Sequence, residues 1–294
     1  MGLPPCEVHN DLPYVNAWIN AEGNFNNLSD DTTQCGYELK SWGGTVGMDV
    51  DCTSAFTAAL AVTALHGDYS TSGAADTLDG DMDTLYVSLL GRYARKAWSH
   101  TFAASVGFAS FDVDRSVNKS GIAYGTRGDT NGTGFGFMYE LGYACSLGAN
   151  TSIQPVLNLS YVHGGVGGYT ESGSEAALRV NDMDCNTFTV AAGVRVQKAT
   201  EADAYDRSIL LEGRALAKVV TGDTESEAET ALMAAQKCKA NVKSAEAGNV
   251  GLEIGGGISI PVGQESSFIF VDVSAEIRRG YTNANGTVGY RINF

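Results

Sequence analysis

The chain carries four histidines, and a histidine can activate a serine as a nucleophile when a third polar group orients it. They are His9, His66, His100 and His163. None lies in a His-x-Ser-Asn-Gly run, and the sequence has no Gly-x-Ser-x-Gly motif of the kind that places a serine on a sharp turn. We therefore predict no catalytic residues, and we expect His66 and His163 to end strands near an interface.

Three aspartates, Asp79, Asp81 and Asp83, alternate around Gly80 and could suggest a calcium loop. An EF-hand loop needs a glutamate at its twelfth position, and counting from Asp79 that position is Leu90. A solvated acidic rim accounts for the three residues better. The sequence therefore predicts neither a metal site nor a cofactor.

Many other charged residues occupy every second position of segments that are otherwise apolar. The secondary structure of these segments decides which way the charged side chains point. In the last ten residues, apolar side chains occupy alternate positions from Val288 to Phe294. Successive side chains of a β-strand point to opposite faces, so this segment has one apolar and one polar face. An aromatic last residue on such a strand invites aggregation in a soluble protein, but it suits a closed barrel in lipid.

About twelve segments of ten or more residues alternate in this way. Strands of soluble proteins run about 5–6 residues, whereas segments of about twice that length suit tilted strands that cross a membrane. The approximate spans are 14–26, 35–51, 54–69, 81–94, 98–113, 132–147, 151–163, 184–198, 207–221, 247–262, 267–281 and 285–294.

The connections between these segments alternate in length, which is typical of an outer-membrane barrel with short turns on one rim and long loops on the other. An even strand number then places both termini on the short-turn, periplasmic side. Long connections fall near 27–34, 70–80, 114–131, 164–184 and 222–246. Within the last, residues 225–247 are rich in helix formers, so we predict a helix there; a flexible acidic loop is the alternative.

Composition agrees with a barrel and excludes other classes. Only 18% of the 294 residues are charged, against about 25% in soluble domains. The most apolar run, Ala55 to Leu65, is too short for a spanning helix. A net charge of −15 argues against nucleic acid as a partner.

If the apolar face meets lipid, the polar face must line the lumen. Charges in the middle of strands cannot face hydrocarbon, where a basic residue costs roughly 2–4 kcal/mol. They imply a lumen that is hydrated or filled by a polypeptide; for any single residue, simple bracing of the wall is the alternative reading. The predicted lumen residues are Glu22, Asp49, Arg92, Glu140, Arg195, Glu212, Arg214, Lys218, Glu253, Asp272, Glu276, Arg278 and Arg291.

The six cysteines divide between the two rims, and no Cys-x-x-Cys spacing supports a metal. Cys35 and Cys52 fall at opposite ends of one strand and are too far apart to bridge. A disulfide between Cys185 and Cys238 would tie the predicted helix to the barrel.

Three stretches resemble the translocator (β) domain of type V autotransporters. Trp18 lies in an aromatic first strand, VNAWINAEGNF, and WGGTVGMDV resembles the family's second strand with its Gly-x-Asp step. The strongest match runs from YTESGSEAALRV into FTVAAGVRV. The residues that carry the resemblance are Trp18, Tyr169, Glu171, Ser172, Gly173, Arg179, Gly193 and Arg195.

The resemblance implies a barrel that anchors an N-terminal passenger and helps to export it. Tyr290, Ile292 and Phe294 fit the signal that the outer-membrane barrel assembly machinery recognises on a last strand. A helix normally threads the pore ahead of the first strand, but only residues 1–13 precede Tyr14, and three of them are prolines. We therefore expect passenger and linker to be absent from this chain.

Twelve-stranded barrels also include outer-membrane phospholipases, but the missing serine and histidine motifs argue against an enzyme. We predict an all-β fold, a transmembrane antiparallel β-barrel of about twelve strands and outer-membrane type, spanning 14–294 after a short N-terminal remnant. The predicted partners are outer-membrane lipid, the protein's own passenger segment and the assembly machinery. The alternatives are a passenger-less pore or surface-adhesion barrel and, more distantly, a soluble β-sandwich.

Overall fold

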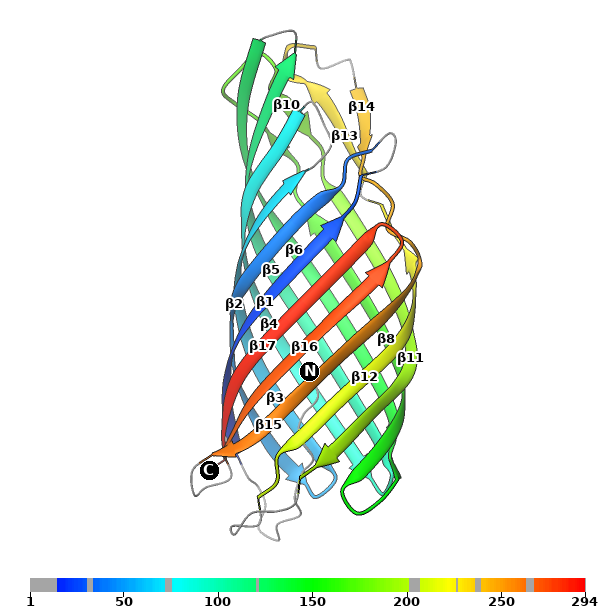
Figure 1. Cartoon of the computed structure of the whole chain (residues 1–294). Helices are drawn as coiled ribbons and strands as arrows, with labels where there is room; N and C mark the ends of the chain where they lie inside the picture. Colours follow the sequence, from blue (N-terminus) through cyan, green and yellow to red (C-terminus); the bar gives the residue numbers. More distant parts are fainter. Residues whose placement is uncertain are drawn as a thin grey trace.

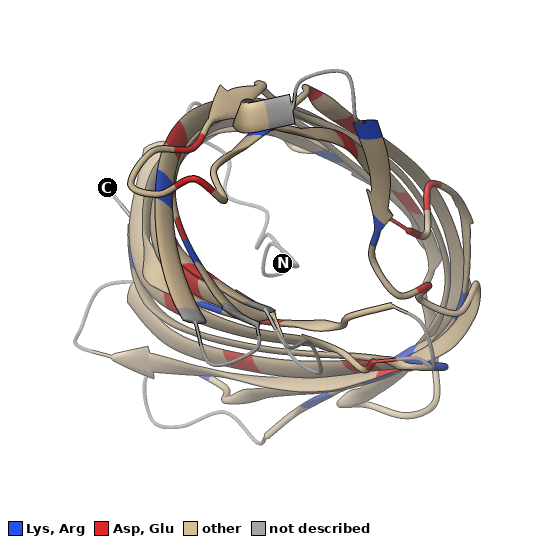
Figure 2. Cartoon of the chain, turned by 90° about the horizontal axis from the view of Figure 1, so that it is seen from above, with Lys and Arg blue, Asp and Glu red and all other residues tan. Residues whose placement is uncertain are grey.

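The computed structural model describes residues 15–30, 34–71, 76–119, 122–200, 207–225, 227–235, 239–262 and 267–293. Within these ranges, twelve long antiparallel strands form one closed barrel (Figures 1 and 2). The strands are β1 (Val15–Leu28), β2 (Tyr37–Thr53), β3 (Phe56–Thr71), β4 (Asp76–Arg95), β5 (Trp98–Lys119), β6 (Ile122–Tyr143), β8 (Thr151–Val166), β11 (Met183–Ala199), β12 (Leu210–Gly222), β15 (Val250–Val262), β16 (Ser267–Arg278) and β17 (Tyr281–Asn293).

Pairing between neighbouring strands is continuous around the ring. The first and last strands, β1 and β17, pair along their length, and β11 pairs with both β8 and β12. The two-residue β7 (Cys145–Ser146) pairs with β8 beside a short turn. Because every long strand has two neighbours, no edge of the ring is left unpaired. The predicted barrel of about twelve strands is confirmed.

Side-chain alternation sorts the strands into an outer and an inner face. On β1, Ile19 is 56% exposed and points outward, whereas its neighbour Asn20 is 4% exposed and points inward. The same holds on β2, where Val46 is exposed and Thr45 is buried. Apolar side chains exposed around a closed ring need a nonaqueous surrounding, because a surface patch this large is not stable in water.

Aromatic side chains mark both ends of the apolar band. At the short-turn end, Trp98 and Tyr143 meet edge to face with ring centroids 4.7 Å apart. Toward the other end, Trp42 meets His66 at 5.6 Å. Such belts place a barrel at the two interfaces of a bilayer. Tyr14 and Phe294, the aromatic residues at the outer ends of the first and last strands, lie outside the described residues.

One wall of the barrel is much taller than the other. Strands β4, β5 and β6 have 20, 22 and 22 residues, whereas β12, β15, β16 and β17 have 12 or 13. The long loop predicted for 114–131 is therefore wrong, because most of it belongs to β5 and β6. Polar residues on both faces made this part resemble a loop, since above the apolar band the outer face of a strand also meets water.

A second, four-stranded sheet lies at the tall end, at the top of Figure 1. We call it the rim sheet; it consists of β9 (Tyr169–Thr170), β10 (Leu178–Val180), β13 (Glu227–Leu232) and β14 (Lys239–Lys243). The helix predicted for 225–247 is wrong: in the described part of this region, the elements are β13, β14 and one 3-10 turn, Met233–Ala235. Strand pairing, supported by cross-strand ion pairs such as Lys243–Glu227 at 3.1 Å, outweighs the weak helix propensity of the sequence.

Two further observations complete the fold. None of the helices in the described part of the chain is long and apolar enough to cross a membrane. Cys238, the predicted disulfide partner of Cys185, lies outside the described residues.

Candidate functional site: the barrel lumen

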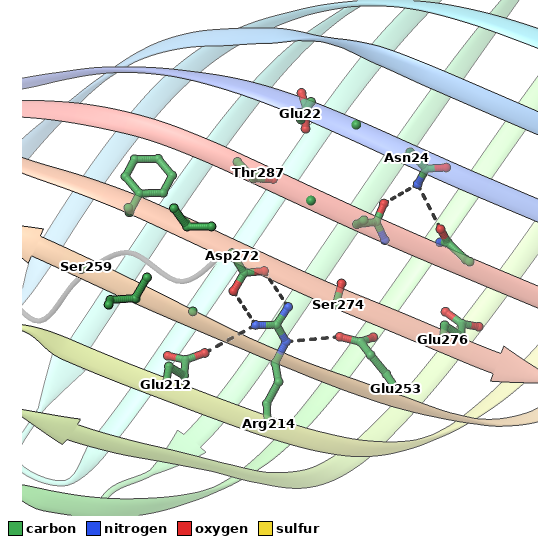
Figure 3. A pocket seen from close by; sticks show the side chains of 18 of the residues that line it. Glu22, Asn24, Glu212, Arg214, Glu253, Ser259, Asp272, Ser274, Glu276 and Thr287 are labelled. Atoms are coloured by element: carbon green, nitrogen blue, oxygen red, sulfur yellow. Dashed lines mark hydrogen bonds and ion pairs between the residues drawn. The ribbon is translucent and has the colours of Figure 1, made fainter.

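Arg214 of β12 is at the centre of a charged network on the inner face of the barrel (Figure 3). Its two terminal nitrogens donate hydrogen bonds to the two carboxylate oxygens of Asp272 at 2.7 and 2.8 Å. Its Nε lies 3.4 Å from Glu253, and a terminal nitrogen lies 3.7 Å from Glu212. The planar fork of an arginine suits such multiple contacts, so one side chain ties three strands together.

A glycine allows Arg214 to reach that far. Asp272 lies on β16, and Arg214 must cross β15 to contact it. Arg214 pairs with Gly255 on β15, and a Cβ built there would lie 2.8 Å from the guanidinium carbon. Glycine therefore leaves the space in which the guanidinium lies.

The network continues toward the tall end through Lys218. Its Nζ lies 2.9 Å from Glu253 and 2.6 Å from Glu276. Arg278 joins with its Nε 2.9 Å from Glu276 and its guanidinium 4.0 Å from the ring centre of Tyr281. Glu253 thus lies between Arg214 and Lys218, and Glu276 lies between Lys218 and Arg278.

In the other direction, Arg195 carries the network across β6, β8 and β11. It donates to both carboxylate oxygens of Glu140 at 2.9 and 3.0 Å and to Gln154 at 3.1 Å. Its Nε lies 3.2 Å from Glu212. Gln154 in turn donates to Ser99 at 2.7 Å.

The network almost neutralises itself. It holds four cations and five carboxylates, and every cation lies within 4.0 Å of a carboxylate. We call this inner surface of β6, β11, β12, β15 and β16 the charged wall. Because its charges are already paired, it braces the barrel more than it attracts a charged ligand.

Asp49 forms a separate buried site near the start of β1. Its side chain is fully buried, accepts a hydrogen bond from Asn16 at 2.8 Å and pairs with Arg291 at 2.7 Å. These three residues come from β2, β1 and β17, so the site joins the first and last strands of the barrel. Asp49 was predicted to line the lumen; it faces inward but lies beneath other side chains.

The remaining predicted lumen residues also face inward. Glu22 accepts a hydrogen bond from Thr45 at 2.9 Å, and Thr45 contacts Thr63 at 2.7 Å. Arg92 lies opposite buried Thr57 on the inner face of β4.

Uncharged amides line the seam between β1 and β17. Asn24 donates to Asn283 at 3.1 Å and also to Asn285. Asn26 donates to Asn24 at 2.8 Å and accepts from the Tyr281 hydroxyl at 2.6 Å. Sequence reasoning missed this ladder because it followed charges; the signal that could have found it is the alternation of asparagines on both strands.

These surfaces enclose one cavity of about 600 Å³. Its lining comes from β1, β2, β3 and β4 on one side and from β11, β12, β15, β16 and β17 on the other. Among the described residues, therefore, the charged wall and the opposite wall face the same space.

The residues that carry the family resemblance divide into two groups. Trp18, Gly193 and Arg195 lie within the barrel. The Trp18 ring lies over Gly47, where a Cβ would approach it to 2.3 Å, and at Gly193 a Cβ would lie 2.0 Å from the carbonyl oxygen of Ala215. Both glycines are required by close packing.

The other group, Tyr169, Glu171, Ser172, Gly173 and Arg179, lies at the rim sheet. Ser172 forms an isolated bridge to Arg127 of β6, Gly173 has a φ of 106°, which favours glycine, and Arg179 pairs with Thr170 within the sheet. The ring of Tyr169 lies over Gly128. Together they attach the rim sheet to the tall wall.

Glu171 makes the strongest of these attachments. It accepts two hydrogen bonds from Arg115 of β5, at 2.9 and 2.6 Å, and one from the Leu178 backbone at 2.9 Å. Only 1% of its side chain is exposed. Burial alone would raise the pKa of this carboxyl, but the hydrogen bonds from Arg115 and Leu178 outweigh it and hold the pKa below its usual range.

We expect the rim sheet to loosen in acid. A carboxyl with a lowered pKa contributes stability above its unfolded pKa of about 4.3, and that contribution is lost as the pH falls through the folded value. Hydrogen exchange of β9 and β10 should therefore accelerate below about pH 4 while β15 and β16 stay protected. In Glu171→Gln the rim sheet should exchange quickly already at neutral pH; equal exchange in variant and parent would contradict the assignment.

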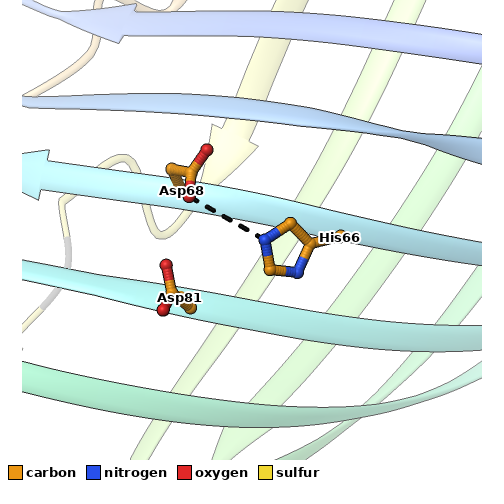
Figure 4. A group of neighbouring side chains, drawn as sticks. All are labelled: His66, Asp68 and Asp81. Carbon is orange, nitrogen blue, oxygen red and sulfur yellow. Dashed lines mark ion pairs between the residues drawn. The ribbon is translucent and has the colours of Figure 1, made fainter.

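An acidic patch covers the outer face of the tall wall. Asp68, Asp81, Asp112 and Asp129 stand directly opposite one another across β3, β4, β5 and β6. Beside them, His66 hydrogen-bonds Asp83 at 2.8 Å. Metal-binding atoms of His66, Asp68 and Asp81 lie within 4.8 Å of one another (Figure 4). These side chains are open to solvent, and exposed acidic groups commonly gather without an ion, so the cluster does not define a metal site.

The same row predicts a stabilising substitution. Like charges directly opposite each other destabilise a sheet, by roughly 0.2–1 kcal/mol a pair, and Asp81 has one on each side. Asp81→Asn should therefore raise the free energy of unfolding by a similar amount in low salt. In about 1 M salt, where screening acts over about 3 Å, the gain should vanish. A loss of stability in low salt would show that Asp81 makes a favourable contact instead.

A closed ring with an even number of strands, an apolar outer band and a charged, hydrogen-bonded interior defines an outer-membrane β-barrel. A family model described as the autotransporter beta-domain matches residues 17–274. The chain belongs to this family, and it is accordingly a translocator barrel of type V secretion in the bacterial outer membrane, a domain type that implies a linked passenger segment.

Solved structures show the same architecture. The chain is similar to the translocator domain of the autotransporter NalP from Neisseria meningitidis, with a TM-score of 0.71 and 15% identity over 97% of this chain and 90% of that one. The beta domain of the Bordetella autotransporter BrkA matches with a TM-score of 0.68 and 13% identity over 96% of this chain and 100% of that one. The transport unit of the autotransporter AIDA-I from Escherichia coli matches with a TM-score of 0.62 and 13% identity over 95% of this chain and 90% of that one. A comparison with curated proteins finds no match to this chain.

Proposed function

We propose that the lumen of this barrel holds the segment that joins the passenger to β1 and supports its passage across the outer membrane. The observation that carries this proposal is the cavity bounded by β1 itself and by the charged wall. β1 begins at Val15, so the chain that precedes it is joined to the barrel beside the cavity. The closed wall separates a polypeptide in this cavity from the surrounding lipid.

The proposed mechanism makes and breaks no bond. The thirteen predicted lumen residues keep the wall rigid and wet, and the buried Asp49 site fixes the start of β1 relative to β17. The long-loop end with its rim sheet faces the cell exterior, and both termini lie on the periplasmic side. Outer-membrane lipid covers the apolar band, and the assembly machinery recognises the last strand through Tyr290, Ile292 and Phe294.

Conductance in a planar bilayer tests the proposal. The purified chain should form a pore, and its conductance should fall when upstream residues that link it to a passenger are added ahead of Met1. Asp81→Asn, on the outer face of the tall wall, would serve as the control, because Asp81 belongs neither to the seam nor to the cavity lining. Equal conductance with and without the upstream residues would contradict the proposal and favour a plain pore.

A further inference from the structure

An open groove of about 550 Å³ lies on the outer face of the barrel, where the apolar band ends toward the tall end. Its sides are Trp42 on β2 and Phe108 on β5, which are 62% and 55% exposed. Between them, the small side chain of Ala64 leaves the space open, with Leu85 beside it on β4. The groove opens into the surface that faces lipid, because exposed apolar side chains continue down the same strands: Val62, Val87 and Val106.

Polar side chains border the groove on the side of the tall end. They stand opposite one another across β3 to β6 in one row: His66, Asp83, Ser110 and Asn131. The Nδ1 atom of His66 lies 2.8 Å from the Asp83 carboxylate, and its Nε2 atom lies 3.9 Å from Asp68 (Figure 4). The side chains of Asp83 and Asp68 are 73% and 64% exposed. A molecule in the groove therefore has carboxylate oxygens within reach of its polar end.

The charge around this polar border is strongly negative. The next row toward the tall end consists of four carboxylates: Asp68, Asp81, Asp112 and Asp129. Lys40 stands opposite Asp68 but is paired with Glu38 at 2.5 Å. Arg127 is likewise paired, with Asp114 at 2.7 Å. Within the described part of the chain, no lysine or arginine lies within 4.0 Å of a carboxylate in this row.

The row of carboxylates costs the folded protein stability, because like charges directly opposite each other destabilise a sheet. Proteins retain such costly features most often where function requires them. A cation that arrives with a bound molecule would remove the repulsion. A groove that is apolar below and acidic above matches an amphiphile with an apolar chain and a cationic head, since each part of the molecule then meets a complementary surface.

We propose that the groove binds a membrane lipid whose head group carries a primary ammonium group. The acyl chain lies between Trp42 and Phe108, and the ammonium group donates hydrogen bonds to the carboxylates of Asp83 and Asp68. A lipid is favoured over a soluble cation because the groove continues into the apolar band, where an acyl chain stays out of water. An anionic head group is disfavoured, since the carboxylates would repel it. This site lies on the outer face and does not depend on what the lumen holds.

Quenching of Trp42 fluorescence by brominated lipids measures occupancy of the groove. In a Trp98→Phe background, Trp42 is the only tryptophan that faces lipid, because Trp18 lines the lumen. The protein would be placed in phosphatidylcholine vesicles with EDTA, each containing a small fraction of one brominated lipid. Brominated phosphatidylethanolamine should quench at about three- to tenfold lower mole fraction than brominated phosphatidylcholine, which has the same phosphate but no N–H donor. Brominated phosphatidylglycerol, which is anionic, should quench least.

Nearly isosteric variants separate the charge from the groove. Asp68→Asn with Asp83→Asn keeps the apolar sides of the groove and removes two negative charges, so phosphatidylethanolamine and phosphatidylcholine should then quench equally. Asp79→Asn is the matched control: it lies on the same face of β4, about 13 Å along the strand from Asp83, and should keep the preference. A preference that survives the double variant, or that disappears equally in Asp79→Asn, would contradict the assignment.

Two further outcomes would overturn the proposal. If all three brominated lipids quench Trp42 equally in the parent, the groove does not select a head group. If phosphatidylglycerol quenches best, and only when calcium replaces EDTA, the carboxylates bind a divalent cation that bridges to anionic lipid. Migration of unheated samples on denaturing gels would show that each variant is folded, so that loss of the barrel is not mistaken for loss of the site.

Discussion

Replacing Gly193 by alanine should lower the free energy of unfolding of the barrel by about 3 kcal/mol or more. The substitution adds only one methyl group. A Cβ at this position would lie 2.0 Å from the carbonyl oxygen of Ala215 and 2.8 Å from the Cα of Leu216. Both atoms belong to the backbone of β12, so relief requires β11 and β12 to move apart. Overpacking of a flexible side chain usually costs about 1–3 kcal/mol, and a rigid sheet has less freedom to adjust.

The neighbouring strand supplies a matched control. At Gly213 of β12, nothing lies within 4 Å of the position that a Cβ would take. Gly213→Ala should therefore leave stability within about 0.5 kcal/mol of the parent. Urea unfolding in lipid vesicles, together with the migration of unheated samples on denaturing gels, measures both variants. Similar losses in the two would mean that the predicted close approach at Gly193 does not exist.

Replacing Arg214 by glutamine should have the second-largest effect. The change leaves Glu212, Glu253 and Asp272 without the cation that they share. Removing one partner of a buried ion pair costs about 3–5 kcal/mol. Here Asp272 is 38% exposed, and water in the lumen screens the remaining carboxylates, so we expect a loss of about 1–3 kcal/mol. The added negative charge should also shift the reversal potential toward cation selectivity.

A double variant separates charge balance from loss of packing. Asp272→Asn combined with Arg214→Gln removes the pair together and should recover part of the stability and most of the original ion selectivity. Arg214→Lys should preserve selectivity but lose the two-point contact with Asp272. If Arg214→Gln alone had the same stability and the same ion selectivity as the parent, the network would not brace the wall.

The strands and their faces could be predicted because alternation is a local property. Val288 to Phe294 reveals which face meets lipid, and the same rule assigns Arg195, Arg214 and Glu276 to the interior without any knowledge of their partners. The partners themselves depend on register between strands. Gln154 accepts a hydrogen bond from Arg195, and Asn283 accepts one from Asn24. Neither residue carries a charge or lies in a recognisable motif.

The rim sheet could not be predicted for a different reason. The segment that contains β13 and β14 has the composition of a helix, but the pairing of β13 with β14 and with β10 gives it an extended form. The ion pair between Glu171 and Arg115 attaches the rim sheet to β5. Glu171 and Arg115 are far apart in the sequence. The family resemblance identified Glu171 but gave no indication of its partner. Long-range pairing thus decided the structure where local propensity was weak.

Surface exposure of a passenger is the most direct test of the central claim. A small reporter protein, preceded by a secretion signal and joined to β1 through a polar linker, would be expressed in a Gram-negative bacterium. If the barrel is a translocator, protease added to intact cells should degrade the reporter while the barrel remains folded in the outer membrane. A folded barrel whose reporter stays protected until the outer membrane is permeabilised would contradict this account.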